Sequence, residues 1–562
     1  MNIQFSLGKN IPYTAIEISD EITAEDLAER YREETPWPVV AAIINHEVKP
    51  LITPIHENDT VQLLDIRNKQ AYLIFQNSLI LLFICSVRQI LGNVHVEVMT
   101  SLNDGLFLQV MRHGEDGEFQ VVDMSEDDVA RTYFYMKKMV QEDHPIEAKM
   151  FRRKEAMEIL KETGLTEKYR SLQRVKVDET VRIYTLEGYS DFFYNYMVPS
   201  TGYVSKFELM KYREGLLLRH PSAQNPGVIP DYVDEYRVYN ALKEQRQWNH
   251  LLGVQYQADI NDRIESGAYR TLIKLSEALH DKKIVEIADR ISKEEKKVVL
   301  ILGPSSSGKT TFAHRLIIQL MVNGMKPLYI GTDDYFVERE DTPLDADGQK
   351  NYENIDALDL PLFNLQMKDL LEGREVDMPV FNFKTGHKEF GKRKTRLVRN
   401  GVIVIEGIHA FNHLLTRQLP EESKFRIYIS PLTQINLDSH NRIPTTDTRV
   451  IRRIVRDNRN RAHTAAMTLH LWPKVREGEN KNIFPLSNEA DVFFNTVHVY
   501  EMTVLKKYAV PLLKEVRQEE EEYAEAQRLL RLFRYVDSLD DESIIAGDSI
   551  LREFIGGSIY TD

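Results

Sequence analysis

The sequence predicts a multidomain α/β chain whose C-terminal half contains a doubly wound parallel β-sheet. The chain has 562 residues, which corresponds to about three or four domains of ordinary size. Apolar strands starting near residues 298, 328, 402, 426 and 491 alternate with helical stretches, the pattern of a parallel sheet covered by helices. The first of these strands runs into a glycine- and serine-rich turn, GPSSSGKTTF, that opens a helix.

The composition is that of an acidic, folded protein. Hydrophobic residues make up 42% and charged residues 28% of the chain, as in ordinary globular proteins rather than disordered or fibrous ones. The formal net charge of −14 argues against attraction of the whole protein to nucleic acid. An anionic ligand therefore needs a local binding site.

The sequence shows no sign of secretion or membrane insertion. The N-terminus, MNIQFSLGKNIPYT, lacks a basic segment followed by an apolar core and a cleavage site. The longest apolar run, LILLFIC, is far shorter than the roughly 20 residues that span a bilayer. The single cysteine, Cys85, ends this run, and we expect a buried thiol. We therefore expect a cytoplasmic protein without a membrane partner.

Residues 1–66 alternate short apolar strands with one helix. MNIQFSL and VVAAIINH flank the helical stretch ITAEDLAERYREE, in which Thr23 precedes acidic residues as a helix N-cap does, and the unit closes with DTVQLLDI. The order is strand, strand, helix, strand, strand. With TAEDLA, VVAAIINHEV and VQLLDI, this segment resembles the ubiquitin-like TGS domain of threonyl-tRNA synthetases, certain GTPases and stringent-response enzymes. The resemblance implies a β-grasp fold.

Residues 67–225 mix apolar helices with strands. FQNSLILLFICSVRQILG and DFFYNYMVPSTGYVSKFELMKY resemble the second additional domain of threonyl-tRNA synthetases, which implies an α+β domain. The family's H-x-x-x-H and C-x-x-x-H editing pairs fall here on Asn77 and Leu81, and on Phe193 and Met197. None of the four is a histidine or cysteine, and a leucine, phenylalanine or methionine cannot act as a hard metal ligand or proton carrier. We expect the domain shape to be kept and the metal site to be degenerate.

Two further segments are expected to be helical. Residues 226–296 are heavily charged and predict a solvated helical connector. Residues 511–562 predict a C-terminal helical tail, in which the acid run QEEEEY lies on a solvated helix face. Residues 297–510 between them form the nucleotide-binding region described next.

The stretch KKVVLILGPSSSGKTTFAHRLIIQLMVNG combines a β-branched strand, G-x-x-x-x-G-K-T and a helix closing near Gly324. This is the context of a phosphate-binding loop. The backbone amides at the helix N-terminus are expected to surround phosphate oxygens, Lys309 to add a point charge, and Thr310 to offer its hydroxyl to Mg²⁺. The residues expected to bind a nucleoside triphosphate are Gly303, Ser305, Ser306, Ser307, Gly308, Lys309, Thr310 and Thr311.

Two later strands end in acids. PLYIG is followed by Thr332, Asp333 and Asp334, and GVIVIEGIH carries Glu406 at its end. Open α/β sheets bind their ligands at these strand ends. Phosphoryl transfer needs a held metal, neutralised phosphate oxygens and an acceptor hydroxyl oriented towards a base. Asp333 is therefore the candidate base, and Thr310, Asp333 and Glu406 are the candidate metal ligands.

An arginine-rich segment, TTDTRVIRRIVRDNRNRAH, follows the next strand, FRIYIS. It could be a solvated helix, an RNA contact or a mobile lid whose guanidinium groups neutralise the moving phosphoryl group. Beside a phosphate loop we favour the lid.

These motifs resemble a known family. GPSSSGKTTF, TDDYF, PVFNF, VIVIEGIH and DTRVIRRIVRD follow in the order and spacing of uridine kinases, within the phosphoribulokinase and uridine kinase superfamily. With TPLDADGQKNYENIDALD, NLDSHNRI and REFIGGS, the whole arrangement resembles bacterial nucleoside kinases, or long uridine kinases. The resemblance implies transfer of the γ-phosphate of ATP or GTP, with Mg²⁺, to the 5′-hydroxyl of a pyrimidine nucleoside.

The resemblance also implies residue roles. Asp333 matches the general base, Glu406 and Thr310 match magnesium-associated positions, and Asp356 matches an acid that holds ribose hydroxyls. The implied catalytic residues are Asp333, Lys309, Arg453, Arg456 and Arg461, and the implied acceptor-binding residues are Asp333, Tyr335, Asp356, Phe381, Phe383 and His387.

This sequence also departs from the family. The family's base-contacting tyrosine falls on Phe381, its histidine falls on Gly386 with His387 one place off, and a last lid arginine falls on His463. Phosphoryl transfer is therefore better supported than uridine specificity.

Two alternatives stay open. The acceptor could be another small hydroxylated metabolite, because the base-contacting positions depart from the family. The chain could instead be an RNA-associated regulatory protein, in which residues 1–225 contact tRNA and the phosphate loop is a switch. The acidic charge and the lack of an N-K-x-D guanine-reading motif oppose this second reading. Assembly into a homo-oligomer and the role of residues 1–225 in regulation, assembly or RNA contact also stay open.

Overall fold

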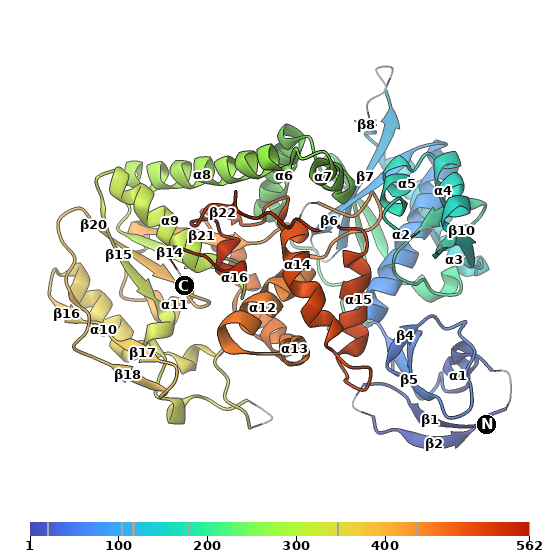
Figure 1. Ribbon diagram of the computed structural model, residues 1–562, viewed down its shortest axis with the longest axis horizontal. Coiled ribbons are helices and arrows are strands. Elements are labelled where there is room, and N and C mark those ends of the chain that lie inside the picture. The colour runs from blue at the N-terminus through green and yellow to red at the C-terminus, as the bar shows by residue number, and fades with distance from the viewer. Residues whose placement is uncertain are drawn as a thin grey trace.

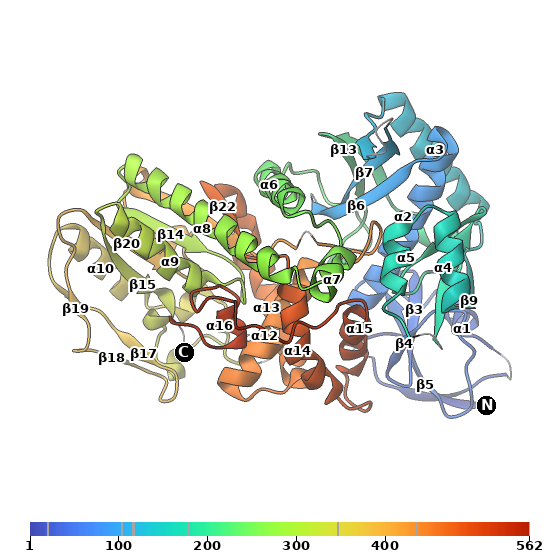
Figure 2. The same cartoon turned by 45° about the horizontal axis from the view of Figure 1, so that its top comes forward.

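The computed structural model describes residues 1–9, 11–19, 22–102, 105–114, 119–176, 179–345, 348–433 and 435–560. In Figure 1 the N-terminal and middle regions lie at the right and the nucleotide-binding sheet lies at the left. The C-terminal helices lie between them, and Figure 2 shows the same arrangement from a second side.

The N-terminal region is a five-stranded sheet of order β2-β1-β5-β3-β4 with one helix. Its elements are β1 Asn2–Ser6, β2 Thr14–Glu17, α1 Ala24–Arg30, β3 Val39–Ile44, β4 Glu47–Lys49 and β5 Thr60–Asp65. Thr23 caps α1 as predicted, with its side chain accepting from the backbone N–H of Asp26. The short β4 was not predicted. It forms because Asn45 and His46 have φ of 51° and 67°, the geometry of a two-residue hairpin turn.

The middle region packs two antiparallel sheets around a buried helix. The sheets have orders β11-β10-β9 and β12-β13-β7-β6, with β8 beside β7. The elements are α2 Lys69–Leu91, β6 His95–Leu102, β7 Gly105–His113, β8 Phe119–Val121, α3 Glu126–Glu142, β9 Glu147–Arg152, α4 Arg153–Glu162, α5 Thr166–Leu172, β10 Thr180–Leu186, β11 Tyr189–Phe192, the 3₁₀ turn η1 Thr201–Val204, β12 Glu208–Tyr212 and β13 Gly215–Arg219.

Helix α2 is the core of this middle region. Among the described residues it alone is long and apolar enough to cross a membrane, but 89% of its most apolar window is buried inside the protein. Cys85 lies in it with an exposure of 7%, and burial raises the pKa of its thiol. The prediction of a buried cysteine is confirmed.

The five-stranded parallel sheet has the order β15-β20-β14-β21-β22, with β14 Val298–Leu302, β15 Lys326–Gly331, β20 Gly401–Glu406, β21 Lys424–Ser430 and β22 Val492–Asn495. Val299 and Ile301 of β14 pack in one apolar cluster with Phe312 of α9 Lys309–Val322. Val298 and Leu300 point to a second cluster that includes helix α10 Leu360–Leu371. Helices therefore cover both faces, and the predicted doubly wound sheet is confirmed.

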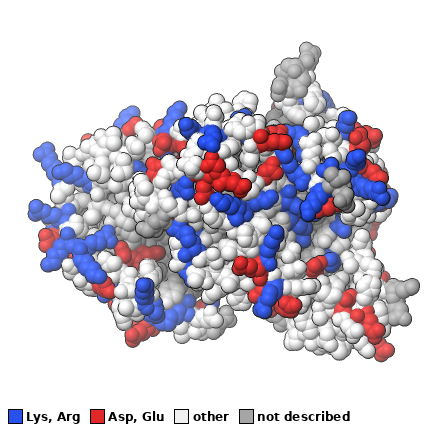
Figure 3. Space-filling model, in the orientation of Figure 1, with Lys and Arg blue, Asp and Glu red and all other residues white. Residues whose placement is uncertain are grey.

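The remaining elements surround this sheet. Two small hairpins pair β16 Val376–Asp377 with β19 Lys394–Thr395, and β17 Val380–Asn382 with β18 His387–Glu389. Lys and Arg side chains gather at the left edge of Figure 3, where Figure 1 draws these hairpins. The helices and 3₁₀ turns are η2 Thr332–Tyr335, η3 Arg339–Asp341, η4 Ile355–Ala357, α11 His413–Thr416, η5 Glu421–Ser423, α12 Thr445–Arg461, α13 Ala465–Asn482, η6 Phe484–Glu489, α14 Glu501–Lys514, α15 Tyr523–Phe533 and α16 Arg552–Ile555.

Residues 226–296 are helical, as predicted, but they are more than a solvated connector. They form α6 Tyr236–Leu252, α7 Gln257–Glu265 and α8 Tyr269–Lys293. Leu272, Ile284 and Ile291 of α8 are at most 1% exposed and belong to the same apolar cluster as the parallel sheet. The charged residues that suggested a connector occupy the outer face of a core helix.

The C-terminal tail is also part of the core. Ile550, Leu551 and Phe554 are fully buried and pack in the cluster of the parallel sheet. The same cluster contains Leu160 and Ile183 of the middle region. The hydrophobic core is therefore continuous from the middle region to the C-terminal helices.

Candidate active site

The carboxyl ends of three adjacent strands bring the predicted site residues together. In the register of the sheet, Glu406 at the end of β20 lies opposite Ile301 of β14 on one side and Gly331 of β15 on the other. The phosphate loop follows β14, and Asp333 follows β15 by two residues. Parallel strands all point towards one edge, so segments distant in sequence meet there.

The loop has the backbone of a phosphate cradle. Ser306 and Gly308 have φ of 58° and 83°, and a Cβ on Gly308 would lie 2.5 Å from a methyl group of Ile550. Only glycine fits at position 308. The hydroxyls of Ser306 and Ser307 are buried, and neither has a hydrogen-bond partner within the described part of the chain. Two unpaired hydroxyls at a helix N-terminus fit an anionic ligand.

Lys309, Thr310 and Glu406 meet at the start of α9. The Thr310 hydroxyl donates to Glu406 Oε2 at 3.3 Å, and the Tyr329 hydroxyl donates to the same oxygen at 3.1 Å. Lys309 Nζ lies 4.0 Å from the other Glu406 oxygen. Burial raises the pKa of Glu406, and the Lys309 ammonium opposes that shift. A hydroxyl and a carboxylate side by side are hard oxygen ligands and fit Mg²⁺.

Asp333 lies open to solvent at the neighbouring strand end. Neighbouring protein atoms displace water from around its carboxyl, and this desolvation raises its pKa. The Lys309 ammonium lowers the pKa, and the Asp334 carboxylate raises it further. Asp334 itself points elsewhere, because it accepts from Arg393 at 2.8 Å and from the backbone N–H of Phe381 at 3.3 Å. Of the two adjacent acids, Asp333 is the one that is exposed to solvent.

The arginine-rich segment forms α12, and its first half is not a mobile lid. Arg449 and Arg452 are at most 1% exposed. Arg449 pairs with Glu479 of α13 and donates to Ser305 O at 3.1 Å, while Arg452 pairs with Glu501 of α14. Moving these charges away from their buried partners is costly. The lid prediction is therefore wrong for this half of the helix.

The three predicted lid arginines lie along the rest of α12. Arg453, Arg456 and Arg461 all pair with Asp457, which is 1% exposed. The three guanidinium groups hold the pKa of Asp457 below its usual value. Arg453 also donates to the Ser305 hydroxyl at 2.8 Å. One carboxylate therefore gathers these guanidinium groups beside the phosphate loop.

The predicted acceptor residues are only partly brought together. Phe381 and Phe383 form an aromatic cluster with Phe336, with ring centroids 5.1–6.4 Å apart. His387 is half exposed and pairs with Glu338 at 2.6 Å.

Two other predicted acceptor residues lie apart from this cluster. Tyr335 is fully buried in the core, where its hydroxyl donates to Gln366 at 2.7 Å and its ring packs on Phe363. Asp356 is exposed on η4. Tyr335 is a core residue because its hydroxyl already has a buried partner.

Sequence reasoning missed Glu353, three residues before Asp356. Its carboxyl lies close enough to feel the charges of Glu479, Arg453, Lys309 and Asp333. Burial, with Glu479 adding to it, raises the pKa of Glu353 to about 7. The stretch NYENIDALD contains three acids, and its sequence pattern does not indicate which of them faces the site. Glu353 could therefore not be singled out from the sequence.

Sequence reasoning also missed two carboxylates on the phosphate loop itself. Glu479 accepts from the backbone N–H of Ser305 at 3.0 Å. Glu553 of α16 accepts from the backbone N–H and the hydroxyl of Thr311, at 3.3 and 2.8 Å. Both acids lie more than 150 residues after the loop, so no local motif announces them. A phosphate oxygen that accepts from the backbone N–H of Ser305 or Thr311 would replace the oxygen of Glu479 or Glu553 that accepts from it here.

A five-stranded parallel sheet with a phosphate loop and two acids at adjacent strand ends defines a P-loop kinase domain. Residues 298–503 match the model of the phosphoribulokinase / uridine kinase family, and this part of the chain is a domain of that family.

Individual relatives agree with this division of the chain. The uridine kinase of Deinococcus deserti is 29% identical over 196 residues, which is 35% of this chain and 85% of that enzyme. A threonine–tRNA ligase of Listeria welshimeri is 26% identical over 194 residues, 34% of this chain but only 29% of the ligase. That similarity lies in the N-terminal part. The predicted arrangement, a synthetase-like region followed by a kinase-family domain, is confirmed.

Among solved structures, a possible uridine kinase from Bacillus stearothermophilus is similar over 37% of this chain and all of its own, with 20% identity and a TM-score of 0.25. A putative fructose transport system kinase from a Silicibacter species is similar over 38% of this chain, with 14% identity and a TM-score of 0.27.

Proposed function

We propose that this protein is a cytoplasmic nucleoside kinase that transfers the γ-phosphate of ATP or GTP to the 5′-hydroxyl of a pyrimidine nucleoside, with uridine and cytidine as the first candidates. The observation that carries the proposal is the placement of Asp333 beside Lys309 and Glu406, on strand ends adjacent to the phosphate loop. The proposed base, the lysine that would bind phosphate and the oxygen that would bind the metal are then close together.

In the proposed reaction the loop amides and the Lys309 ammonium hold the β- and γ-phosphates. The acceptor hydroxyl gives its proton to the Asp333 carboxylate as its oxygen bonds to the γ-phosphorus. The bond from the γ-phosphorus to the β–γ bridging oxygen breaks, and the nucleoside diphosphate leaves with that electron pair. Arg453 and Arg456, which now pair with Asp457, turn to the phosphoryl oxygens and stabilise their charge.

Thr310 and Glu406 are the residues that would hold magnesium, with Asp333 as a third candidate ligand. Bound there, Mg²⁺ would neutralise charge on the β- and γ-phosphate oxygens. The direct contact between the Thr310 hydroxyl and Glu406 supports these two as a pair.

On the acceptor side, Phe381 and Phe383 offer aromatic faces for a nucleobase. Glu353 is the acid we propose for the ribose hydroxyls, in place of the exposed Asp356. Because Phe381 and Gly386 depart from the family's base-contacting residues, the alternative acceptor is another small hydroxylated metabolite.

A panel of nucleosides and sugars, offered with ATP or GTP and Mg²⁺ and scored by phosphorylated product, tests the function. We expect pyrimidine nucleoside 5′-monophosphates, and loss of product when EDTA removes the metal. A sugar phosphate as the main product would favour the alternative acceptor. No phosphorylated product from any acceptor, with a tight salt-sensitive complex between the chain and tRNA, would favour the RNA-associated reading.

Glu353→Gln is expected to raise KM for the nucleoside about tenfold, the usual worth of a hydrogen bond to a charged group. Because the pKa of Glu353 is about 7, KM of the native enzyme should fall as pH rises through 7, when the carboxylate forms. In the Gln variant this pH dependence should disappear. The measurement is KM for the nucleoside between pH 5.5 and 8.5.

The same pKa has a consequence for stability. The native carboxyl binds its proton more tightly than the unfolded chain does, so its contribution to stability is present below its ordinary pKa of 4.5 and is lost as pH rises to about 7. Asp356→Asn is the matched control for both effects. If Asp356→Asn raises KM and Glu353→Gln does not, the sequence-based assignment of Asp356 is correct.

A further inference from the structure

The segment NLDSHNRI, residues 436–443, belongs to the kinase-family domain but lies inside the middle region. It connects β21 to α12, and its polar residues Asp438, Ser439 and His440 are at most 2% exposed. Its backbone and its His440 side chain form hydrogen bonds with the backbone of β6. The N–H of Val98 donates to Ser439 O at 2.8 Å, and His440 Nε2 donates to Val96 O at 3.1 Å.

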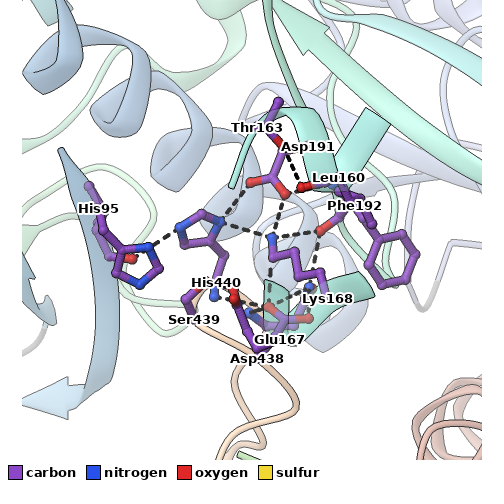
Figure 4. A network of polar contacts seen from close by, with 12 residues as sticks. His95, Leu160, Thr163, Glu167, Lys168, Asp191, Phe192, Asp438, Ser439 and His440 are labelled. Atoms are coloured by element: carbon purple, nitrogen blue, oxygen red, sulfur yellow. Dashed lines mark hydrogen bonds and ion pairs between the residues drawn. The ribbon is translucent and has the colours of Figure 1, made fainter. Parts of the chain in front are cut away.

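A buried charged centre holds this segment. Figure 4 shows the Lys168 side chain pointing to Asp191 and to His440, each from a different segment of the chain. Lys168 Nζ donates to Phe192 O at 3.0 Å, pairs with Asp191 and lies 2.9 Å from His440 Nδ1. The same ring nitrogen lies 2.6 Å from the second oxygen of Asp191. The Ser439 hydroxyl donates to Glu167 at 2.6 Å. The Lys168 ammonium and the His440 ring hold the pKa of Asp191 at about 2, against the effect of its burial.

This centre lies against one of the four positions that correspond to editing residues. Of the four positions that correspond to editing residues, Phe193 stacks on the His440 ring at 6.0 Å, and Lys168 Nζ lies 4.8 Å from the Phe193 ring centre. Leu81 and Met197 are buried in the apolar core, and Asn77 is 9% exposed. The kinase-side segment therefore packs against the middle region at Phe193, where the family's editing cysteine is replaced.

The middle region also holds the start of α12. Asp447, in the first turn of that helix, accepts from Lys69 of α2 at 2.8 Å and from Arg528 of α15 at 2.6 and 2.7 Å. Asp447 and Arg528 are both fully buried. Arg449 and Arg453 follow Asp447 by two and six residues in the same helix, and both donate to Ser305 of the phosphate loop.

We propose that residues 67–225 are an anchor that fixes α12, with Lys168, His440 and Lys69 as positioning residues for its arginines. This proposal rests on the proposed kinase function for its catalytic consequence. Loss of the anchor lets α12 shift relative to the phosphate loop, and a displacement of about 1 Å in a positioning element costs on the order of 10²-fold in rate. Residues 67–225 then support catalysis without contacting a substrate.

The test compares two substitutions at His440 in the full-length chain. His440→Phe keeps the ring stack on Phe193 and removes the ring-nitrogen contacts with Lys168, Asp191 and Val96, whereas His440→Gln keeps a donor and an acceptor. For His440→Phe we expect kcat per nucleotide-binding site to fall about 10- to 100-fold with KM for the nucleotide unchanged, and His440→Gln to restore part of that loss. A merely structural role would lower the number of nucleotide-binding sites and leave kcat per site unchanged.

Hydrogen exchange of residues 445–461 gives a readout independent of activity. It should become faster in His440→Phe and stay unchanged in Lys149→Met, a control that removes a surface pair with Glu147 in the same region. If His440→Phe does not fold, the same measurements are made on Lys69→Met. This variant removes one contact of the anchor with α12 but leaves the buried Asp447 paired with Arg528, so we expect it to fold.

Unchanged kcat per site and unchanged exchange in these variants would overturn the anchor. If the native chain phosphorylates no acceptor, only the kinase proposal fails. Faster exchange in the variants then still supports the anchor, and unchanged exchange removes it.

Discussion

Asp333→Asn is expected to lower kcat by about 10²- to 10⁴-fold, the usual contribution of a positioned general base, while nucleotide binding is retained. The asparagine side chain is nearly the same size but cannot accept the hydroxyl proton. The phosphate loop, Lys309 and Thr310 stay in place, so the binding of ATP or GTP with Mg²⁺ should change little. Rapid quench of product formation and calorimetric titration of the nucleotide measure the two effects separately.

Asp334→Asn is the matched control for this change. Its carboxylate holds Arg393 and the backbone N–H of Phe381 rather than facing the site, so we expect lower stability and little loss of kcat in the folded fraction. If Asp333→Asn keeps full activity, Asp333 is not the base. If Asp334→Asn loses activity as strongly as Asp333→Asn, the two acids act as a unit.

Arg452→Met is expected to have the largest effect on stability, a loss of about 3–5 kcal/mol. Arg452 is fully buried and pairs with Glu501, which is 1% exposed. It also donates to Thr496 O at 2.9 Å and to Ser306 O at 3.3 Å. Removing the guanidinium strands a buried carboxylate and frees the phosphate loop carbonyl. The midpoint of urea unfolding measures the loss.

The double change Arg452→Met with Glu501→Leu should recover most of the loss, because no buried charge is left without a partner. Arg32→Met is the control, since its pair with Glu29 is more than 70% exposed on both sides and such pairs contribute at most about 1 kcal/mol. Equal destabilisation in the single and double variants would show that the lost packing, and not the stranded Glu501, sets the cost.

Much of the site could be predicted from local sequence. The loop GPSSSGKTTF directly follows a strand, Asp333 comes two residues after one, and Glu406 ends one. The carboxyl ends of parallel strands lie at one edge of a sheet. Chain direction alone therefore placed the phosphate loop and the two acids together. The same reasoning misplaced Tyr335, because a residue beside a catalytic acid can turn its side chain to either side of the backbone.

The arginines of α12 show where local pattern is insufficient. Their sequence spacing predicts a charged helix, but their roles differ according to the face of the helix that they occupy. Arg449 and Arg452 face the core, where Glu479 and Glu501 neutralise them, and Arg453 and Arg456 face Asp457 at the rim. The partners come from α13 and α14, and no motif pairs them with α12 in advance.

The sequence by itself determined the succession of domains, the phosphate loop and the acids at the strand ends, because contiguous patterns of a few residues specify them. Only the tertiary structure decided that Glu353 turns into the site and that NLDSHNRI enters the middle region, where Lys168 and His440 are 272 residues apart in sequence. Such contacts depend on which buried charges pair with each other when distant segments pack. The hydrophobic pattern of the sequence does not specify these pairs.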